Sequence, residues 1–273
     1  MRALPPPLLL CLGLLMAPLA ARADPLAASP LAELSVATLE LPAQNDPTWA
    51  ARRDAIARLL STLQPDVIAV HQVQQEDRRD PACWLASRLR YSCDFVTADP
   101  PSQAQRHGSA MLSRLPVDED GVTLLHPPGR YSAAGMMRVA VGNGQVNIYV
   151  AQLRPQPDSA TSRQHQTNDL LAWIAATSEG HPSVIAGDFG ASSTDLVRGM
   201  PGYQPARRNP SARVEREGAA LVSTDGSHGL DVLFQVKSFI GQRQKRIELP
   251  AEGELPALPL GFMAVLRLQD PSG

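Results

Sequence analysis

Three carboxylates at the ends of predicted strands are the residues best suited to chemistry in this sequence. Glu40, Asp188 and Asp231 each lie at one end of a short, largely apolar stretch. Carboxylate oxygens are the ligands that small divalent cations such as Mg²⁺ prefer. Whether these side chains meet at one site or are solvated at the edge of an empty cleft depends on the fold that positions them.

Histidines are the second group that could do chemistry, because imidazole transfers protons near neutral pH. No histidine follows His228, which stands three residues before Asp231 and is the one candidate for a general base. His71 lies within an apolar stretch and is expected to be a hydrogen-bonded structural residue. The other histidines are expected to be ordinary surface residues: His107, His126, His165 and His181.

Strand and helix signals alternate along the chain and predict the elements that must position these side chains. Helices are expected from Asp46-Pro47 to about residue 63, over 84–90 and over 162–177. Asn143-Gly144 predicts a hairpin turn. Strands are expected over 34–41, 66–73, 91–96, 108–114, 136–141, 145–153, 183–189, 230–236, 245–249 and 263–268. Hairpins mixed with helices predict an α/β fold with mixed sheets covered by helices.

The N-terminus has the layout of a secretory signal peptide. A positive start at Arg2 precedes an apolar run over 8–19, and Ala21-Arg22-Ala23 offers a cleavage site. The run is shorter than the roughly 20 residues that span a bilayer, so a membrane anchor is not expected. We therefore expect residues 1–23 to be removed on export to the periplasm or outside the cell, leaving residues 24–273 as a single domain.

The composition argues against an extended nucleic-acid-binding surface. Removal of a leader that contains Arg2 and Arg22 leaves 23 basic residues against 27 acidic ones. Proteins that bind nucleic acid through phosphate contacts present a basic patch or stripe. A net negative chain of this kind gives no such signal, although a local patch stays compatible with it.

Two cysteines remain after leader removal, Cys83 and Cys93. An even pair in an exported protein predicts a disulfide, and the short predicted helix between them would bring the chain back to the following strand. The alternative is two unpaired thiols. We expect the pair to be structural and to have no part in catalysis.

Eight segments, in order, resemble the motif blocks of the endonuclease/exonuclease/phosphatase (DNase I-like) superfamily. They extend over roughly residues 35–268, nearly the whole mature chain, and their order and spacing carry the resemblance. The matching segments are Ala37–Leu41, Trp49–Arg52, Pro65–Val73, Gly108–Arg114, Val150–Leu153, Arg163–Gln166, Gly187–Gly190 and Leu230–Phe234. The resemblance implies a four-layer α/β sandwich, in which two packed mixed sheets are flanked by helices.

In that family, a Mg²⁺ ion and a histidine-centred proton relay hydrolyse phosphate esters. The resemblance places Asp188 and Asp231 at retained positions of this machinery. Other positions carry residues that cannot do the same chemistry: Gln72 replaces the metal-binding Glu, Gln152 and Gly261 replace histidines, and Gly190 replaces an Asn. General acid–base catalysis contributes about 10²–10⁴-fold to rate. Loss of these groups predicts a dead or nearly dead site.

Two functional hypotheses follow. In the first, the chain is a catalytically inactive or severely impaired family member, a pseudoenzyme that needs no cofactor and whose cleft binds an unidentified ligand or protein partner. In the second, it is a Mg²⁺- or Mn²⁺-dependent phosphoester hydrolase with a site rearranged around Glu40, Asp188, Asp231 and His228. Only the second hypothesis requires a phosphoester substrate.

Overall fold

The computed structural model describes residues 32–77, 79–153, 159–190, 195, 198–206 and 229–269. The chain divides into two units, Met1–Pro30 and Leu31–Gly273, and the first lies outside the described residues, as does the predicted leader. None of the described helices has the length and apolar character that a membrane crossing requires.

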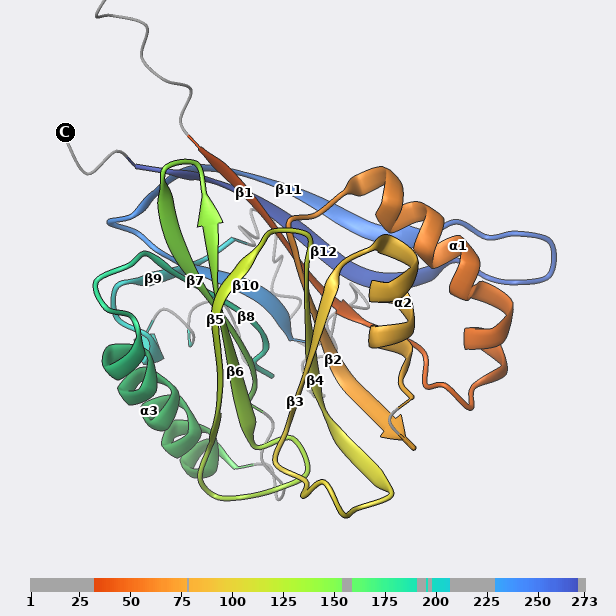
Figure 1. The fold of residues 1–273 in the computed structure, drawn as a ribbon, viewed down its shortest axis with the longest axis horizontal. Helices are drawn as coiled ribbons and strands as arrows, with labels where there is room; N and C mark the ends of the chain where they lie inside the picture. Colours follow the sequence, from red (N-terminus) through yellow and green to blue (C-terminus); the bar gives the residue numbers. More distant parts are fainter. Residues whose placement is uncertain are drawn as a thin grey trace, which may run out of the picture. The chain divides into compact units, whose positions relative to one another are not determined.

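Two mixed six-stranded sheets form the body of the second unit (Figure 1). The first sheet has the order β11 (Phe239–Leu249), β12 (Leu258–Leu268), β1 (Glu33–Glu40), β2 (Val67–Glu76), β4 (Gln105–Ser113) and β3 (Ser92–Thr97). The second has the order β5 (Val117–Leu124), β6 (Ala133–Val141), β7 (Gly144–Gln152), β8 (Ser183–Asp188), β10 (Leu230–Gln235) and β9 (Tyr203–Pro205). Strands β1 and β2 are parallel, as are β7 and β8, whereas the other described neighbours are antiparallel.

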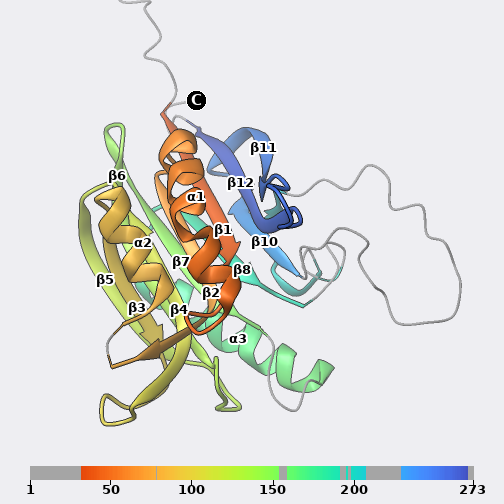
Figure 2. The ribbon, with the colours of Figure 1, turned by 90° about the vertical axis from the view of Figure 1, so that its right-hand side faces the viewer.

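Helices α1, α2 and α3 of the described part of the chain cover the outer faces of the sheets, which completes a four-layer sandwich. Helices α1 (Pro47–Leu63) and α2 (Pro81–Leu89) share an apolar cluster with the first sheet, and α3 (Ala160–Thr177) shares one with the second. A third apolar cluster fills the space between the two sheets. Figure 1 shows α1 and α2 to the right of the sheets and α3 to the left, and Figure 2 looks onto the side that carries α1 and α2. The expected fold class is confirmed.

Local sequence signals account for where the helices and one hairpin begin. Asp46 and Asp80 accept hydrogen bonds from backbone N–H groups in the first turns of α1 and α2, and a proline follows each aspartate. The turn of the β6–β7 hairpin consists of Gly142 and Asn143, one residue earlier than the predicted turn at Asn143-Gly144. Gly142 has a φ of 60°, which suits glycine at the first central position of a tight hairpin turn.

Strand β9 is three residues long and pairs with β10 in a stretch where no strand was expected. Strands β5 and β11 also differ from expectation. Strand β5 was not predicted, because its sequence VDEDGVTL is acidic and lies at the edge of a sheet, where polar side chains face solvent. Strand β11 begins at Phe239, several residues before the expected start, because pairing with β12 holds its polar residues in the sheet. In both cases the neighbouring strand overrides a weak local signal.

The predicted disulfide is confirmed. Cys83 on α2 and Cys93 on β3 are bonded, with their Cα atoms 5.5 Å apart. The bond closes a short loop and fastens α2 to the edge strand of the first sheet.

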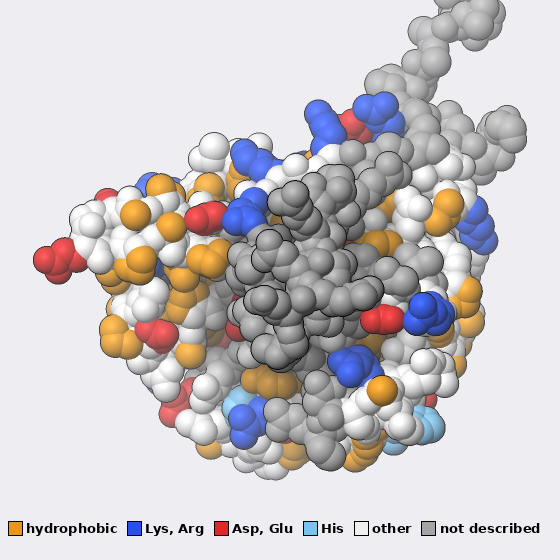
Figure 3. Space-filling model, turned by 180° about the vertical axis from the view of Figure 1, so that it is seen from behind, with side chains coloured by type: hydrophobic (Ala, Val, Ile, Leu, Met, Phe, Trp, Pro, Cys, Tyr) orange, Lys and Arg blue, Asp and Glu red, His pale blue; other side chains and the backbone are white. Residues whose placement is uncertain are grey.

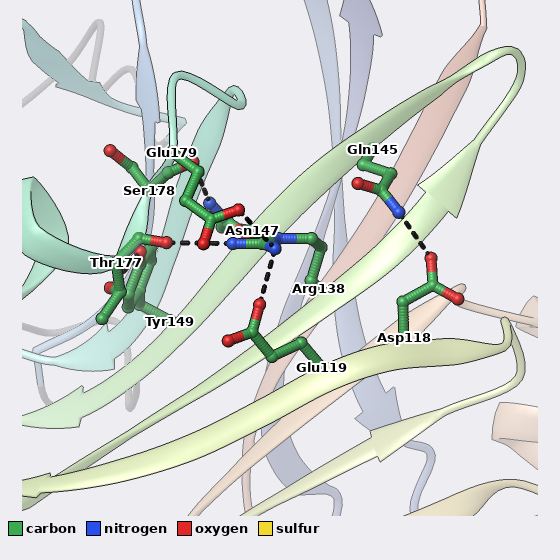
Figure 4. A network of polar contacts seen from close by, with 9 residues as sticks. All are labelled: Asp118, Glu119, Arg138, Gln145, Asn147, Tyr149, Thr177, Ser178 and Glu179. Carbon is green, nitrogen blue, oxygen red and sulfur yellow. Dashed lines mark hydrogen bonds and ion pairs between the residues drawn. The ribbon is translucent and has the colours of Figure 1, made fainter.

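Arg138 on β6 joins the second sheet to the end of α3 through a buried polar network (Figure 4). Its Nε donates to Asn147 Oδ1 at 2.9 Å, and its Nη2 donates to the carbonyl oxygen of Thr177 at 3.0 Å. Its Nη1 lies 2.5 Å from Glu119 Oε2 and 3.0 Å from Glu179 Oε2. A buried guanidinium is tolerated because charged and neutral acceptors surround it on several sides.

Arg52 on α1 also uses a buried guanidinium to connect distant parts of the chain. Its guanidinium is almost fully buried and donates to the carbonyl oxygens of Pro250 and Pro256. These carbonyls belong to the connection between β11 and β12. The arginine of the Trp49–Arg52 segment therefore fixes the connection that leads into the last strand.

Candidate functional site

The apolar core between the sheets gives way to polar side chains at one end of the central strands. Alternation along a strand puts every second residue on the same face. The inter-sheet face of β1 continues from Val36 to Thr38, and that of β8 continues from Ala186 to Asp188. Equivalent steps on β2, β4 and β7 add further buried polar residues. This polar cluster comprises Thr38, His71, Ser109, Gln152 and Asp188, all 3% exposed or less.

His71 is a hydrogen-bonded residue of this cluster, as expected. Its Nε2 lies 3.0 Å from the hydroxyl of Thr38 on the neighbouring strand. Glu40 pairs with His71 in the β1–β2 register and is partly exposed, so it stands at the rim of the cluster. Gln72, which follows His71, has a φ of 55° within a bulge between β2 and β4. The bulge takes the place of regular pairing where the family has its metal-binding Glu.

Gln152 and Asp188 lie side by side at the ends of β7 and β8. Gln152 is 3% exposed, and its Oε1 has no hydrogen-bond partner among the described residues. Asp188 is fully buried, and its Oδ1 accepts a hydrogen bond from the backbone N–H of Gly190 at 3.3 Å. A neutral amide therefore stands next to the retained carboxylate, at the position where the family has a histidine.

Asp231 does not share a face with Asp188. Opposed residues of antiparallel strands point to the same side, and the β8–β10 register pairs Asp231 with Gly187 and Leu230 with Asp188. Leu230 belongs to the inter-sheet core, so Asp231 faces the layer that holds α3. It is 4% exposed, and its Oδ1 accepts a hydrogen bond from the N–H of Val232 at 2.8 Å. Sequence reasoning grouped these carboxylates by their positions in the chain, whereas the register separates them.

Gly261 occupies its position because the backbone of β1 passes very close to it. It has a φ of 148°, and a Cβ built at this position would lie 2.0 Å from the carbonyl oxygen of Thr38. Any side chain would displace β1, and an imidazole would do so most. The family's C-terminal histidine therefore has no room at Gly261 in this chain.

The described residues show no cluster of side chains that identifies a Mg²⁺ or Mn²⁺ site. Within the described ranges, no three His, Cys, Asp or Glu side chains come together closely enough to bind a metal. Glu40 and Asp188 face the same inter-sheet space, with the neutral Gln152 beside Asp188. His228, the candidate base, lies outside the described residues. We derive no chemical step through a metal.

A loop at the end of β8 is held by α3. Arg163 donates from Nη1 to the carbonyl oxygen of Gly190 at 2.9 Å, and Gln166 on the same helix donates to the carbonyl oxygen of Pro127 at 3.2 Å. Gly190 has a φ of 54°, a conformation that glycine adopts without strain. The Arg163–Gln166 segment thus positions backbone around the cluster.

His107 is not the ordinary surface residue that its sequence neighbours indicate. It lies on β4, and its side chain is 15% exposed beside that of Asp99, which is 18% exposed. Its ring packs edge-on against Tyr131, with 6.0 Å between ring centroids. The sequence offered one usable signal, an aspartate eight residues before a histidine in the connection between two predicted strands, but it gave no sign of Tyr131.

Tyr131 links this histidine to the polar cluster. Burial raises the pKa of Tyr131, the nearby Arg130 lowers it, and the carboxylates of Glu40 and Asp99 raise it further. Glu40 on β1 and Asp99 beside β3 therefore act on the same phenol, which comes from the connection between β5 and β6 of the other sheet.

Described charged residues of both signs are interspersed on the face opposite that of Figure 1 (Figure 3). Among the described ion pairs, Arg243 and Arg267 both pair with Glu33. Such pairing lowers the net charge of the surface locally.

These features, two mixed sheets in a four-layer sandwich with a polar cluster at the strand ends, define a DNase I-like domain. The model of the Endonuclease/Exonuclease/phosphatase family matches residues 42–213, and the chain belongs to this family.

Solved structures of the same fold are similar to it along most of its length. Truncated TDP2 from Caenorhabditis elegans has a TM-score of 0.65 and 14% identity, covering 86% of this chain and 97% of that one. The human nocturnin catalytic domain with bound sulfate anion has a TM-score of 0.66 and 18% identity, covering 87% and 94%. A family protein from Bacteroides thetaiotaomicron has a TM-score of 0.65 and 11% identity, covering 89% and 100%. No curated protein sequence matches this chain.

Proposed function

We propose that this phosphoester hydrolase-like domain is a catalytically impaired family member that binds a ligand at the polar ends of its central strands. The observation that carries the proposal is the pairing of Gln152 with Asp188 at the ends of β7 and β8. An amide neither accepts a proton at neutral pH nor carries the charge that would stabilise a transition-state phosphate.

Three further features support the proposal. Gly261 lies against the carbonyl oxygen of Thr38, so a histidine at this position would have to displace β1. Asp231 faces the α3 side of its sheet, whereas Asp188 faces the inter-sheet space, so strand alternation places the two retained carboxylates on opposite faces of the sheet. The unsatisfied Gln152 Oε1 is a buried acceptor, and such groups are stabilised when a donor, from a ligand or from water, reaches them.

Turnover of bis(p-nitrophenyl) phosphate with Mg²⁺ or Mn²⁺ tests this proposal. The purified wild type is expected to match the Asp188→Ala variant, with both at the rate of a buffer control. Metal-dependent hydrolysis that disappears in Asp188→Ala would refute it. A preparation from cells that carry no copy of the gene controls for contaminating phosphodiesterase.

The second candidate is a divalent-metal-dependent phosphoester hydrolase with a rearranged site. The observation that favours it is that Glu40 and Asp188 face the same inter-sheet space. In this case Mg²⁺ or Mn²⁺ binds measurably in a calorimeter, and Glu40→Gln weakens that binding. A wild type that takes up neither ion excludes this candidate.

We also propose that the chain is exported to the periplasm or outside the cell after removal of residues 1–23. The Cys83–Cys93 disulfide supports this proposal, because structural disulfides persist in oxidising compartments. N-terminal sequencing of the protein from cell fractions is expected to give a chain that starts at Asp24. A chain that keeps Met1 and stays in the cytoplasm would contradict it.

A further inference from the structure

Strand β5 is an edge strand whose two halves differ in character. Its first half carries Asp118, Glu119 and Asp120, and a bulge between Val117 and Glu119 interrupts its pairing with β6. Charged side chains and bulges are two ways in which edge strands avoid pairing with another chain. The second half, residues 121–124, has neither of them.

The second half of β5 instead exposes apolar side chains. Val122 and Leu124 are 47% and 53% exposed, and they are two of the four exposed large hydrophobic residues in the described part of the chain. The register with β6 pairs Leu124 with Ala133 of the inter-sheet core, so both side chains lie on the inner face of the second sheet, at its rim. No described strand pairs with the outer side of β5 (Figure 2). An open strand edge beside an apolar strip is suited to pair with another strand.

The other sheet edges in the described part of the chain lack this combination. Strand β9 has only three residues, and β11 carries Arg243, Lys245 and Arg246 together with two register shifts. Strand β3 has six residues and contributes none of the exposed large hydrophobic side chains. Strand β5 is therefore the edge best suited to a second chain.

We propose that β5 pairs with β5 of a second copy of this chain, antiparallel and centred on Thr123, so that the two second sheets become continuous. In this register Val122 of each copy faces Leu124 of the other, and the apolar side chains cover one another. The position opposite Asp120 is His126, so no acidic residue faces another across the pair. The two copies would form a symmetric dimer through a self-complementary contact.

The acidic first half of β5 selects this register over its neighbours. Centring the pair on Thr123 leaves each Asp120 roughly 20 Å from its counterpart, measured along the strands. Moving the centre one residue, to Val122, would set Asp120 against Leu124. Moving it to Gly121 would bring the two aspartates to about 7 Å. Because the Debye length is about 10 Å at roughly 0.1 M salt, the aspartates repel one another strongly only when the centre is Gly121.

Sedimentation of the full chain at micromolar to millimolar concentration tests the proposal. One pair of strands buries less than the roughly 1,200 Å² of a standard interface, so we expect a weak dimer whose fraction rises with concentration. Val122→Lys and Leu124→Lys should each weaken association about tenfold or more, because an unpaired ammonium enters the apolar contact. Val236→Lys is the matched control and should leave association unchanged, since Val236 is also 47% exposed but follows the end of β10.

Cross-linking tests the register. Thr123→Cys, made in a Cys11→Ser background, places two thiols opposite each other with Cα atoms about 5 Å apart, which suits a disulfide. Asp118→Cys in the same background is the control, because its counterpart lies roughly 30 Å away in this register. We expect mild oxidation to give a covalent dimer of the Thr123→Cys variant and none of the Asp118→Cys variant.

Three outcomes would overturn the inference. The first is a wild type that stays monomeric at millimolar concentration or whose mass passes beyond that of a dimer. The second is association that both lysine variants leave unchanged. The third is a covalent dimer that forms as readily with Asp118→Cys as with Thr123→Cys. Circular dichroism verifies the fold of each variant, and the cross-link reports on the contact even if a lysine variant fails to fold.

Discussion

Replacement of Arg138 by methionine is expected to cost about 2–4 kcal/mol of stability, mostly through acceptors that it leaves behind. The side chain is 8% exposed, and methionine keeps much of its apolar stem in place. Asn147 Oδ1 and the carbonyl oxygen of Thr177 would each lose a donor inside the protein, at about 1–3 kcal/mol apiece. The ion pairs contribute less, because Glu119 and Glu179 are 48% and 62% exposed and can regain water.

Urea denaturation followed by circular dichroism measures this cost. Glu119→Gln and Glu179→Gln serve as matched controls and should each cost below about 1 kcal/mol. Salt at 1 M should diminish the effect of the glutamate variants while leaving that of Arg138→Met nearly unchanged, because screening acts on exposed charges. A cost for Arg138→Met within 1 kcal/mol of wild type, or one no larger than that of the glutamate variants, would refute the reasoning.

Three other outcomes can be checked on the same apparatus. Replacing Cys83 and Cys93 by serine should cost about 3 kcal/mol, the value of a closed loop of roughly ten residues in the chain-entropy model, and reduction of the wild type with dithiothreitol should give a similar loss. Burial raises the pKa of Asp94, so the folded state holds this proton more tightly than the unfolded state does. The stability that the Asp94 carboxyl contributes therefore falls as the pH rises above its usual pKa of 3.8. Asp94→Asn should therefore stabilise the protein at pH 7, with the gain shrinking toward pH 4, and a loss at pH 7 would contradict this sign. Gly261→Ala should cost several kcal/mol or prevent folding, since its Cβ would collide with the backbone of β1, and a fully stable variant would show that β1 can move.

Much of the fold could be read from local signals. The caps at Asp46-Pro47, the helical spacing over 162–177 and the apolar strands at 66–73 and 183–189 all formed the expected elements. The pairing of Cys83 with Cys93 followed from their number and separation. These features depend on neighbours within a few residues, so a linear sequence contains them. Strand β5 could not be predicted from local signals because its stability comes from pairing with β6.

The candidate site, like the fold, could be predicted from the sequence only in part. The sequence by itself determined which chemical groups are available: amides at Gln72 and Gln152, a carboxylate at Asp188, and no histidine after residue 228. No local pattern reports how strands pair, because a register is a relation between segments far apart in the chain.

Only the tertiary structure decided where those groups point. The β8–β10 register turned Asp231 away from Asp188, and close packing against β1 left Gly261 no room for a side chain. The approach of the two sheets brought Tyr131 to His107, across 24 residues of chain. A side chain's identity belongs to the sequence, whereas its face and its partners are set by hydrogen bonding and packing between distant strands.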